Sequence, residues 1–229
     1  VTALKQRIEG HFEIKPAEVD LVWEAFTYKP PFYKGKSWAT SKSKVKISAI
    51  PHVILENGKK GSPKDLIYTW QEDRRVLGSL SGIGKQSIII ESPYPFEKTY
   101  IAVHVSSVDG KSGAQKGITI TTQNPEIVFY ERSPSEGIKY ENALPSGFDL
   151  TQEEITVRAE PYFFSTEDLT RDGTSFKWSL NDEEVRSSSH VNEITLRREQ
   201  GAGIARIMLE ARNTAKILQE TTAHMLIRF

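Results

Sequence analysis

The chain has 229 residues, and its 30 basic and 30 acidic residues cancel to a formal net charge of zero. No whole-chain field would therefore draw it to phosphate backbones or anionic lipid, so nucleic acid is not an expected partner. It contains no cysteine, which excludes disulfides, thiolate catalysis and cysteine-based zinc sites. No apolar run approaches the roughly 18–20 residues of a membrane helix, so we expect no membrane span in this chain.

The first predicted element is a short strand within residues 1–18. Phe12 and Ile14 alternate with a polar residue, much as Ile118-Thr-Ile120 does before the second half of the chain. The chain also begins with Val1 rather than with Met. We therefore expect 1–18 to be the terminal strand and linker of a preceding domain, and the chain to be part of a longer multidomain protein.

The remaining residues form two similar halves. Residues 45–53 correspond to 155–163, with Ala49 and Pro51 matched by Ala159 and Pro161. The two halves lie about 106 to 110 residues apart, too far for a solenoid repeat and suitable for a small domain. We predict one domain at 19–123 and a second at 124–229, joined by a short linker.

Both halves alternate apolar and polar residues with a period of two, which is typical of half-buried strands. In chain order we predict strands at 45–49, 66–71, 86–91, 101–105, 117–122, 155–159, 175–180, 193–197 and 224–229. Turn signals such as Asn57-Gly58 and Asp172-Gly173 separate them. One helical turn is expected at 149–154. The pattern predicts an all-β chain with one β-sandwich in each half.

A tryptophan in an early central strand of each half carries a family resemblance. Tyr68-Thr-Trp70 is matched by Phe176-Lys-Trp178, and each is followed by a late alternating strand, at 100–106 and 205–212. These features resemble bacterial immunoglobulin-like domains, including the polycystic-kidney-disease type (PKD-like). The resemblance implies two tandem immunoglobulin-like β-sandwiches in which Trp70 and Trp178 fill the space between the sheets.

Catalytic and cofactor motifs fail at the residues that would do the chemistry. The segment 78–82 has Leu80 where a nucleophile elbow needs Ser. Residues 78–86 are one residue too long for a phosphate loop, and Gln86 replaces the Ser or Thr that would bind magnesium. The five histidines lie in unrelated segments without metal-ligand spacing. We therefore expect no catalytic, cofactor or metal site, and we interpret the glycines at 78–84 as turn residues.

The candidate interaction surface is the segment 28–38, which has four aromatic residues: Tyr28, Phe32, Tyr33 and Trp38. Pro30-Pro31 forces an extended path that cannot donate ladder hydrogen bonds, so we expect a loop or a kinked edge strand. Aromatic planes beside lysines could stack on sugar rings or on a partner protein. In the alternative interpretation, Tyr33 packs under its own sandwich and Phe32 seals the junction with the preceding domain.

A run of lysines follows the aromatic segment, at positions 34, 36, 42, 44 and 46. It predicts a solvated strand edge that is protected against aggregation.

Three classes of function remain open. The chain could be a non-catalytic spacer or adhesion module of a bacterial surface or secreted protein, which binds a protein or glycan at the cell surface. It could instead be a carbohydrate-binding accessory region of a secreted hydrolase, marked by a planar row of exposed aromatics. The third class is an envelope assembly component whose open sheet edge accepts a partner strand. The predicted location is extracellular, cell-surface or periplasmic.

Overall fold

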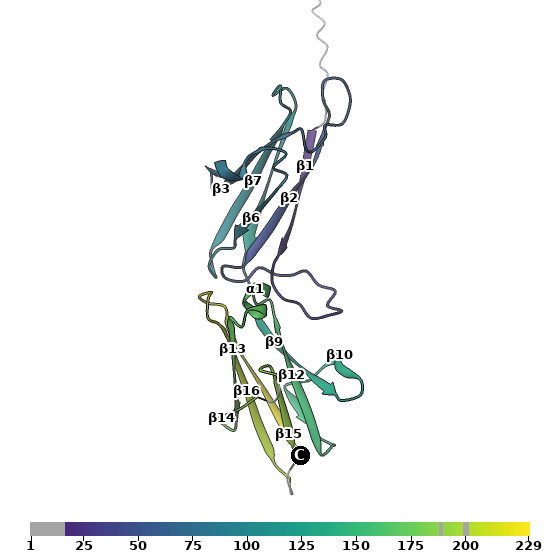
Figure 1. The fold of residues 1–229 in the computed structure, drawn as a ribbon, viewed down its shortest axis with the longest axis vertical. Helices are drawn as coiled ribbons and strands as arrows, with labels where there is room; N and C mark the ends of the chain where they lie inside the picture. Colours follow the sequence, from purple (N-terminus) through teal and green to yellow (C-terminus); the bar gives the residue numbers. More distant parts are fainter. Residues whose placement is uncertain (1–16, 188–189, 199–201) are drawn as a thin grey trace, which may run out of the picture. The chain divides into compact units, whose positions relative to one another are not determined.

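The computed structural model describes residues 17–187, 190–198 and 202–229. Nearly all regular elements within these ranges are β-strands (Figure 1), which confirms the all-β prediction. The strand predicted around Phe12 and Ile14 lies outside the described residues. No helix in the described part of the chain is long and apolar enough to cross a membrane.

The N-terminal half supplies two sheets. Its strands are β1 (Ala17–Ala25), β2 (Lys44–Val53), β3 (Ile67–Glu72), β4 (Arg75–Val76), β5 (Gly82–Ile83), β6 (Ser87–Glu91), β7 (Lys98–Ser106) and β8 (Gly113–Thr121). One sheet has the order β1-β2-β6, and the other has the order β4-β3-β7-β8, with β5 paired to β3. A 3-10 turn at Gly78–Leu80 lies between β4 and β5. Gly78 and Gly84 are therefore turn residues, as predicted, whereas Gly82 opens β5.

The C-terminal half supplies two further sheets. Its elements are β9 (Glu126–Ser133), β10 (Gly137–Ala143), β11 (Gly147–Asp149), β12 (Glu154–Tyr162), α1 (Thr166–Thr170), β13 (Thr174–Leu180), β14 (Glu183–Val185), β15 (Glu193–Arg197), β16 (Ile204–Asn213) and β17 (Glu220–Arg228). The sheet orders are β10-β9-β12-β15 and β11-β17-β16-β13-β14. Figure 1 shows β9, β12 and β15 in one layer and β13 and β16 in the other, which is an immunoglobulin-like sandwich.

The described residues group into two compact units. Among the described residues, the first unit contains residues 17–21 together with Ala49–Gln86 and Ala102–Gly117. The second contains Val22–Ser48, Ser87–Ile101 and Ile118–Phe229. Strands β1, β2, β7 and β8 thus contribute residues to both units, and the domain boundaries at 19–123 and 124–229 stay a prediction.

The first unit has a core around Trp70. This side chain is 0% exposed, and Tyr68 on the same strand is also buried. The indole N–H of Trp70 donates a hydrogen bond to the carbonyl oxygen of Lys85 at 2.8 Å, so its polar atom is satisfied. The predicted burial of Trp70 is confirmed.

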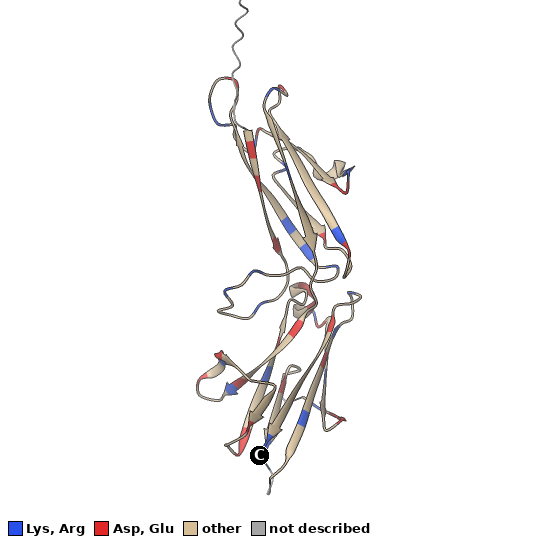
Figure 2. Ribbon diagram, turned by 180° about the vertical axis from the view of Figure 1, so that it is seen from behind, with Lys and Arg blue, Asp and Glu red and all other residues tan. Residues whose placement is uncertain are grey.

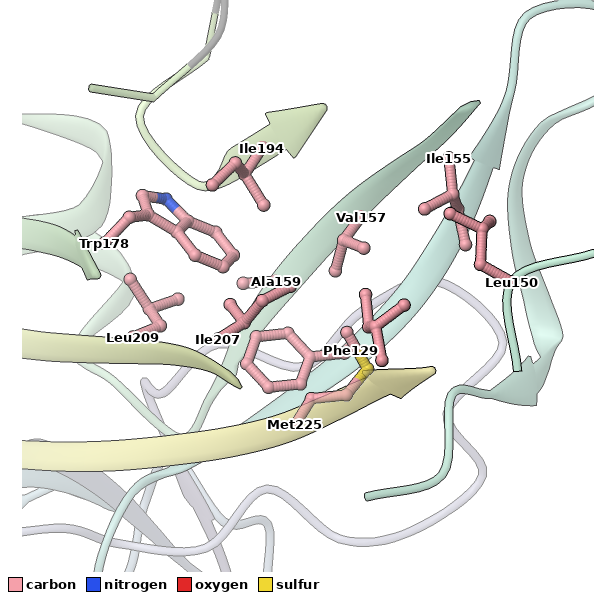
Figure 3. Close-up of a cluster of buried hydrophobic side chains, with 11 residues drawn as sticks. Phe129, Leu150, Ile155, Val157, Ala159, Trp178, Ile194, Ile207, Leu209 and Met225 are labelled. Atoms are coloured by element: carbon pink, nitrogen blue, oxygen red, sulfur yellow. The ribbon is translucent and has the colours of Figure 1, made fainter. Parts of the chain in front are cut away.

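The second unit has a matching core around Trp178, which is 1% exposed. Figure 3 shows its indole among aliphatic side chains from both sheets, near Phe129 of β9. The two ring centroids lie 5.9 Å apart, and the indole N–H donates to the carbonyl oxygen of Val191 at 3.0 Å. The predicted burial of Trp178 is therefore confirmed too.

The helical turn predicted at 149–154 is wrong. Asp149 belongs to β11, which pairs in parallel with β17, and the N–H of Leu150 donates to the carbonyl oxygen of Arg228 at 2.8 Å. Ladder bonding therefore takes the backbone groups that a helix would need. The short helix lies instead at Thr166–Thr170, where Glu167 and Asp168 in the first turn favour a helix N-terminus.

Candidate interaction surface

The segment 28–38 lies in the connection between β1 and β2, within the second unit. No part of it is assigned to a strand, in agreement with the predicted loop. The side chains of Thr27 and Ser37 hold its two ends together: Thr27 Oγ1 donates to the carbonyl oxygen of Trp38 at 2.7 Å, and Ser37 Oγ donates to the carbonyl oxygen of Thr27 at 2.8 Å. The loop is therefore closed at its base by buried hydrogen bonds.

Tyr33 and Trp38 pack against an aromatic cluster at the end of β12. The Tyr33 ring meets Tyr162 edge to face at 5.5 Å and Phe163 at 6.0 Å. Trp38 packs against the same cluster, which also contains Tyr130. The interpretation that Tyr33 tucks under its own sandwich is thus wrong, because its partners come from the C-terminal half of the sequence.

Tyr28 belongs to a buried polar network centred on Glu160. The Glu160 side chain is 0% exposed, although it lies on β12 among apolar residues. Tyr28 donates its hydroxyl to Glu160 Oε2 at 2.6 Å, while Tyr140 and Arg158 donate to Oε1 at 3.1 and 3.0 Å. Three donors from three segments thus satisfy one buried carboxylate, as a charge in a dry environment requires.

Arg158 links Glu160 to a second buried carboxylate, Glu193 on β15. Arg158 Nη1 donates to Glu193 Oε1 at 2.9 Å, and Arg132 of β9 donates to Oε2. Burial favours the neutral acid, but the hydrogen bonds from Arg158 and Arg132 outweigh it and lower the pKa of Glu193. The network therefore holds ionised groups of both signs in contact on one sheet.

The tyrosines of the network are neutral hydrogen-bond donors. The pKa of the Tyr28 hydroxyl is raised, mainly by burial and next by the hydrogen bond to Glu160. Burial and the negative charge of Glu160 raise the pKa of Tyr140 to about 12. Both hydroxyls keep their protons at physiological pH, so Tyr28 and Tyr140 act as structural donors.

A cavity of about 250 Å³ opens beside this network. It is lined by Tyr28, Arg158, Glu160, Pro161, Thr166, Leu169, Thr170, Phe176, Val191 and Asn192. Its two charged lining groups, Arg158 and Glu160, are hydrogen bonded to each other. Pairing inside the wall neutralises the local charge, so the arrangement is that of a structural network rather than of an exposed acid or base.

Phe32 differs from the other three aromatic residues of the candidate surface. It is 86% exposed and its φ of 66° lies in the left-handed region, which is unfavourable for a residue with a side chain. Its ring centroid lies 6.4 Å from that of Tyr140. Among the described residues Phe32 projects into solvent, and the interpretation that it seals a junction with a preceding domain stays a prediction.

The lysines of the run after the loop have several kinds of neighbours. Lys36 Nζ lies 3.2 Å from the ring centroid of Trp23, and Lys42 Nζ lies 4.0 Å from that of Tyr94, both cation–π contacts. Lys44 pairs with Glu167 at 2.7 Å. Figure 2 shows both signs of charge interspersed along the strands, in keeping with the neutral composition.

Phe96 is a candidate interaction residue that sequence reasoning missed. It lies in the connection between β6 and β7, is fully exposed and has a φ of 70°. The sequence signal was present, because Pro93-Tyr-Pro-Phe96 combines prolines and aromatics much as Tyr28-Lys-Pro-Pro-Phe32 does.

Comparison with known proteins identifies no family by sequence. No family model matches the chain, and no curated protein matches it. Among solved structures, the three N-terminal domains of the highly immunogenic outer capsid protein of bacteriophage RB49 are similar, with 12% identity and a TM-score of 0.46. The match covers 93% of this chain and 59% of that one, so the chain spans less than two thirds of that structure.

Two other solved structures are similar at lower TM-scores. Sidekick-1 immunoglobulin domains 1–4 give a TM-score of 0.28 at 8% identity, covering 90% of this chain and 74% of that one. The fibronectin(III)-like modules of Clostridium thermocellum CbhA give 0.27 at 13% identity, covering 90% and 93%. The fold described above is therefore the main basis for a proposal about function.

Proposed function

We propose that this chain is a non-catalytic, extracellular or cell-surface module of a larger bacterial protein, which acts as a structural spacer or as an adhesion and interaction region. Its domains are proposed to be PKD-like immunoglobulin domains at 19–123 and 124–229. The partner is proposed to be a protein or a glycan at the cell surface, and the contact is proposed to be made by the loop 28–38.

The observation that supports this proposal is the division of roles within the loop. Tyr28, Tyr33 and Trp38 are used for packing and hydrogen bonding inside the second unit, whereas Phe32 is 86% exposed. A large apolar side chain held outward in the left-handed region is unfavourable for the isolated fold. Residues held in strained backbone conformations cluster at binding and catalytic sites, which supports a role of the exposed Phe32 in recognition.

The carbohydrate-binding alternative requires a planar row of exposed aromatics. Within the loop 28–38, Phe32 is exposed, whereas Tyr33 and Trp38 are half-buried against other rings. This geometry favours a single aromatic anchor on a protein partner over stacking along a sugar chain.

A binding screen tests the proposal. The purified chain is applied to a glycan array and to bacterial and host cells, beside the variant Phe32→Ala and the matched variant Ile83→Ala, which removes another exposed apolar side chain. We expect attachment to cells that is abolished by Phe32→Ala and kept by Ile83→Ala. Equal attachment of all three proteins, or no attachment by the unmodified chain, would overturn the role of the loop.

A further inference from the structure

Two nearly identical five-residue segments pair with each other in the second unit. Residues 154–158 of β12 read Glu-Ile-Thr-Val-Arg, and residues 193–197 of β15 read Glu-Ile-Thr-Leu-Arg. They run antiparallel, with Glu154 opposite Arg197, Thr156 opposite Thr195 and Arg158 opposite Glu193. The sequence of β15 is therefore complementary to a near copy of itself read in the opposite direction.

Each polar pair in this register makes a direct contact. Arg197 Nη2 lies 2.8 Å from Glu154 Oε2, the two threonine Oγ1 atoms lie 3.0 Å apart, and Arg158 Nη1 lies 2.9 Å from Glu193 Oε1. On the core face, Ile194 lies opposite Val157 and Leu196 opposite Ile155. Opposite charges, hydroxyls and aliphatic side chains are thus all matched across the two strands, which stabilises an antiparallel pair.

Strand β15 is also the terminal strand of its sheet among the described residues. Two backbone hydrogen bonds show which N–H and C=O groups around β15 face β12. The N–H of Ala159 donates to the carbonyl oxygen of Asn192, and the N–H of Arg198 donates to the carbonyl oxygen of Glu153. Because alternate residues of an antiparallel strand bond to the same neighbour, the backbone groups of Thr195 and Arg197 point away from β12. They face the open edge.

We propose that two copies of this chain associate through antiparallel pairing of β15 with β15, about a two-fold axis at Thr195. Each Thr195 then exchanges two backbone hydrogen bonds with Thr195 of the second copy. The N–H of Arg197 donates to the carbonyl oxygen of Glu193 of the second copy on either side. The N–H of Glu193 takes no part, because it donates to His190 O within its own chain. The contact is isologous, as a two-fold dimer requires.

The charges of the joined sheet would alternate without a like-charge neighbour. Four charged side chains would lie side by side across the joined sheet. They are Glu154 of β12 and Arg197 of β15 in one copy, followed by Glu193 of β15 and Arg158 of β12 in the second copy. The central row consists of threonines, and Ile194 meets Leu196 of the second copy on the core face. The side-chain pairs between copies are therefore those that the chain already forms within itself between β12 and β15.

Strand β6, the corresponding edge of the sheet β1-β2-β6, lacks this complementarity. Its residues 87–91 read Ser-Ile-Ile-Ile-Glu, so a two-fold pairing about Ile89 would place Ser87 opposite Glu91 and would form no ion pair between the copies. Of these two edge strands, β15 is the self-complementary one. Strand β6 supplies the matched control.

Charge substitution at the two-fold axis tests the proposal. Thr195→Asp and Thr195→Lys each place like charges opposite each other in the dimer, while inside one chain they face the neutral Thr156. In sedimentation velocity we expect the unmodified chain to form a dimer and each variant to raise the dissociation constant at least about tenfold. An equimolar mixture of the two variants should restore a dimer with one subunit of each kind.

The controls are Ile89→Asp and Ile89→Lys, which change the charge at the centre of β6 and should leave the dimer intact. A monomeric unmodified chain across the concentration series would overturn the proposal. The proposal would also be overturned if Thr195→Asp and Thr195→Lys were each monomeric and their mixture stayed monomeric. Residue 195 of one copy would then not lie opposite residue 195 of the other.

A cysteine variant keeps the proposal testable if a charged variant does not fold. The chain has no cysteine, so Thr195→Cys supplies the single thiol, and Cα atoms about 5.5 Å apart suit a disulfide. We expect oxidation to give a covalent dimer of the Thr195→Cys protein and none of the Thr156→Cys protein, whose thiol lies one strand inside the edge. Equal cross-linking of both variants, or none of either, would contradict pairing about Thr195.

Discussion

Tyr28 and Glu160 are joined by a hydrogen bond of 2.6 Å although 132 positions separate them in the sequence. The bond fixes the loop 28–38 to the buried carboxylate of β12. It makes the aromatic segment, in large part, a structural element of the second unit. Phe32 is left as its exposed aromatic side chain.

Replacing Tyr28 with Phe should lower the free energy of unfolding by about 2 kcal/mol, because a hydrogen bond to a charged group contributes about 1.5–3 kcal/mol. The effect is expected to be smaller for Tyr140→Phe, whose hydroxyl lies farther from Glu160, at 3.1 Å. Denaturant unfolding measures both values. In a double-mutant cycle of Tyr28→Phe with Glu160→Gln, the effect of the double variant should differ from the sum of the two single effects. Strictly additive effects would show that the hydrogen bond contributes nothing to stability.

Truncating either buried tryptophan should destabilise the core that contains it. Trp70→Ala and Trp178→Ala are each expected to lower the unfolding free energy by about 3–5 kcal/mol, the usual effect of removing a buried aromatic side chain. The measurement is the urea midpoint at constant slope. The exposed Ile83 provides a control, since Ile83→Ala should stay within about 0.5 kcal/mol of the unmodified chain. Similar midpoints for all three variants would contradict the core assignment.

The ion pairs of Glu193 should make stability depend on acid pH. Because the pKa of Glu193 is lowered in the folded state, its contribution is complete above the unfolded pKa of about 4.3. That contribution is lost as the pH falls through the folded pKa. Glu193→Gln should therefore destabilise the chain at pH 7 by about 3 kcal/mol, the effect of breaking a buried ion pair. The difference should shrink as the pH falls below about 4.3. Thermal unfolding of the unmodified chain and of Glu193→Gln at a series of acid pH values measures this difference in stability. A difference that stays constant with pH would show that the ion pairs of Glu193 do not contribute to stability.

Much of the fold was readable from local patterns. The period-two alternation at 155–159 and 193–197 corresponds to β12 and β15, and Trp178 is buried as its place in an alternating strand indicates. These features depend on side chains that are close together in the sequence. Short-range periodicity is sufficient to predict them.

The site was harder to predict because its partners are distant in sequence. Glu160 and Arg158 look like solvent-facing polar residues of a strand, and their burial becomes clear only when Tyr28 and Tyr140 are brought to them. The near-identity of residues 154–158 and 193–197 was visible in the sequence, but their register and the open edge of β15 required the sheet order. The five-residue helix at Thr166–Thr170 is too short to show a helical period.

Phe32 serves recognition in the proposed function, whereas Tyr33 serves packing. The most direct test compares Phe32→Ala with Tyr33→Ala, with the melting temperature and the attachment to cells measured for each variant. Tyr33→Ala removes a ring packed on Tyr162 and Phe163, so we expect a loss of about 2 kcal/mol, or roughly 4–8 °C. Phe32→Ala should leave the melting temperature within about 2 °C of the unmodified chain while abolishing attachment. A large drop in the melting temperature of Phe32→Ala, or an unchanged one for Tyr33→Ala, would contradict the account.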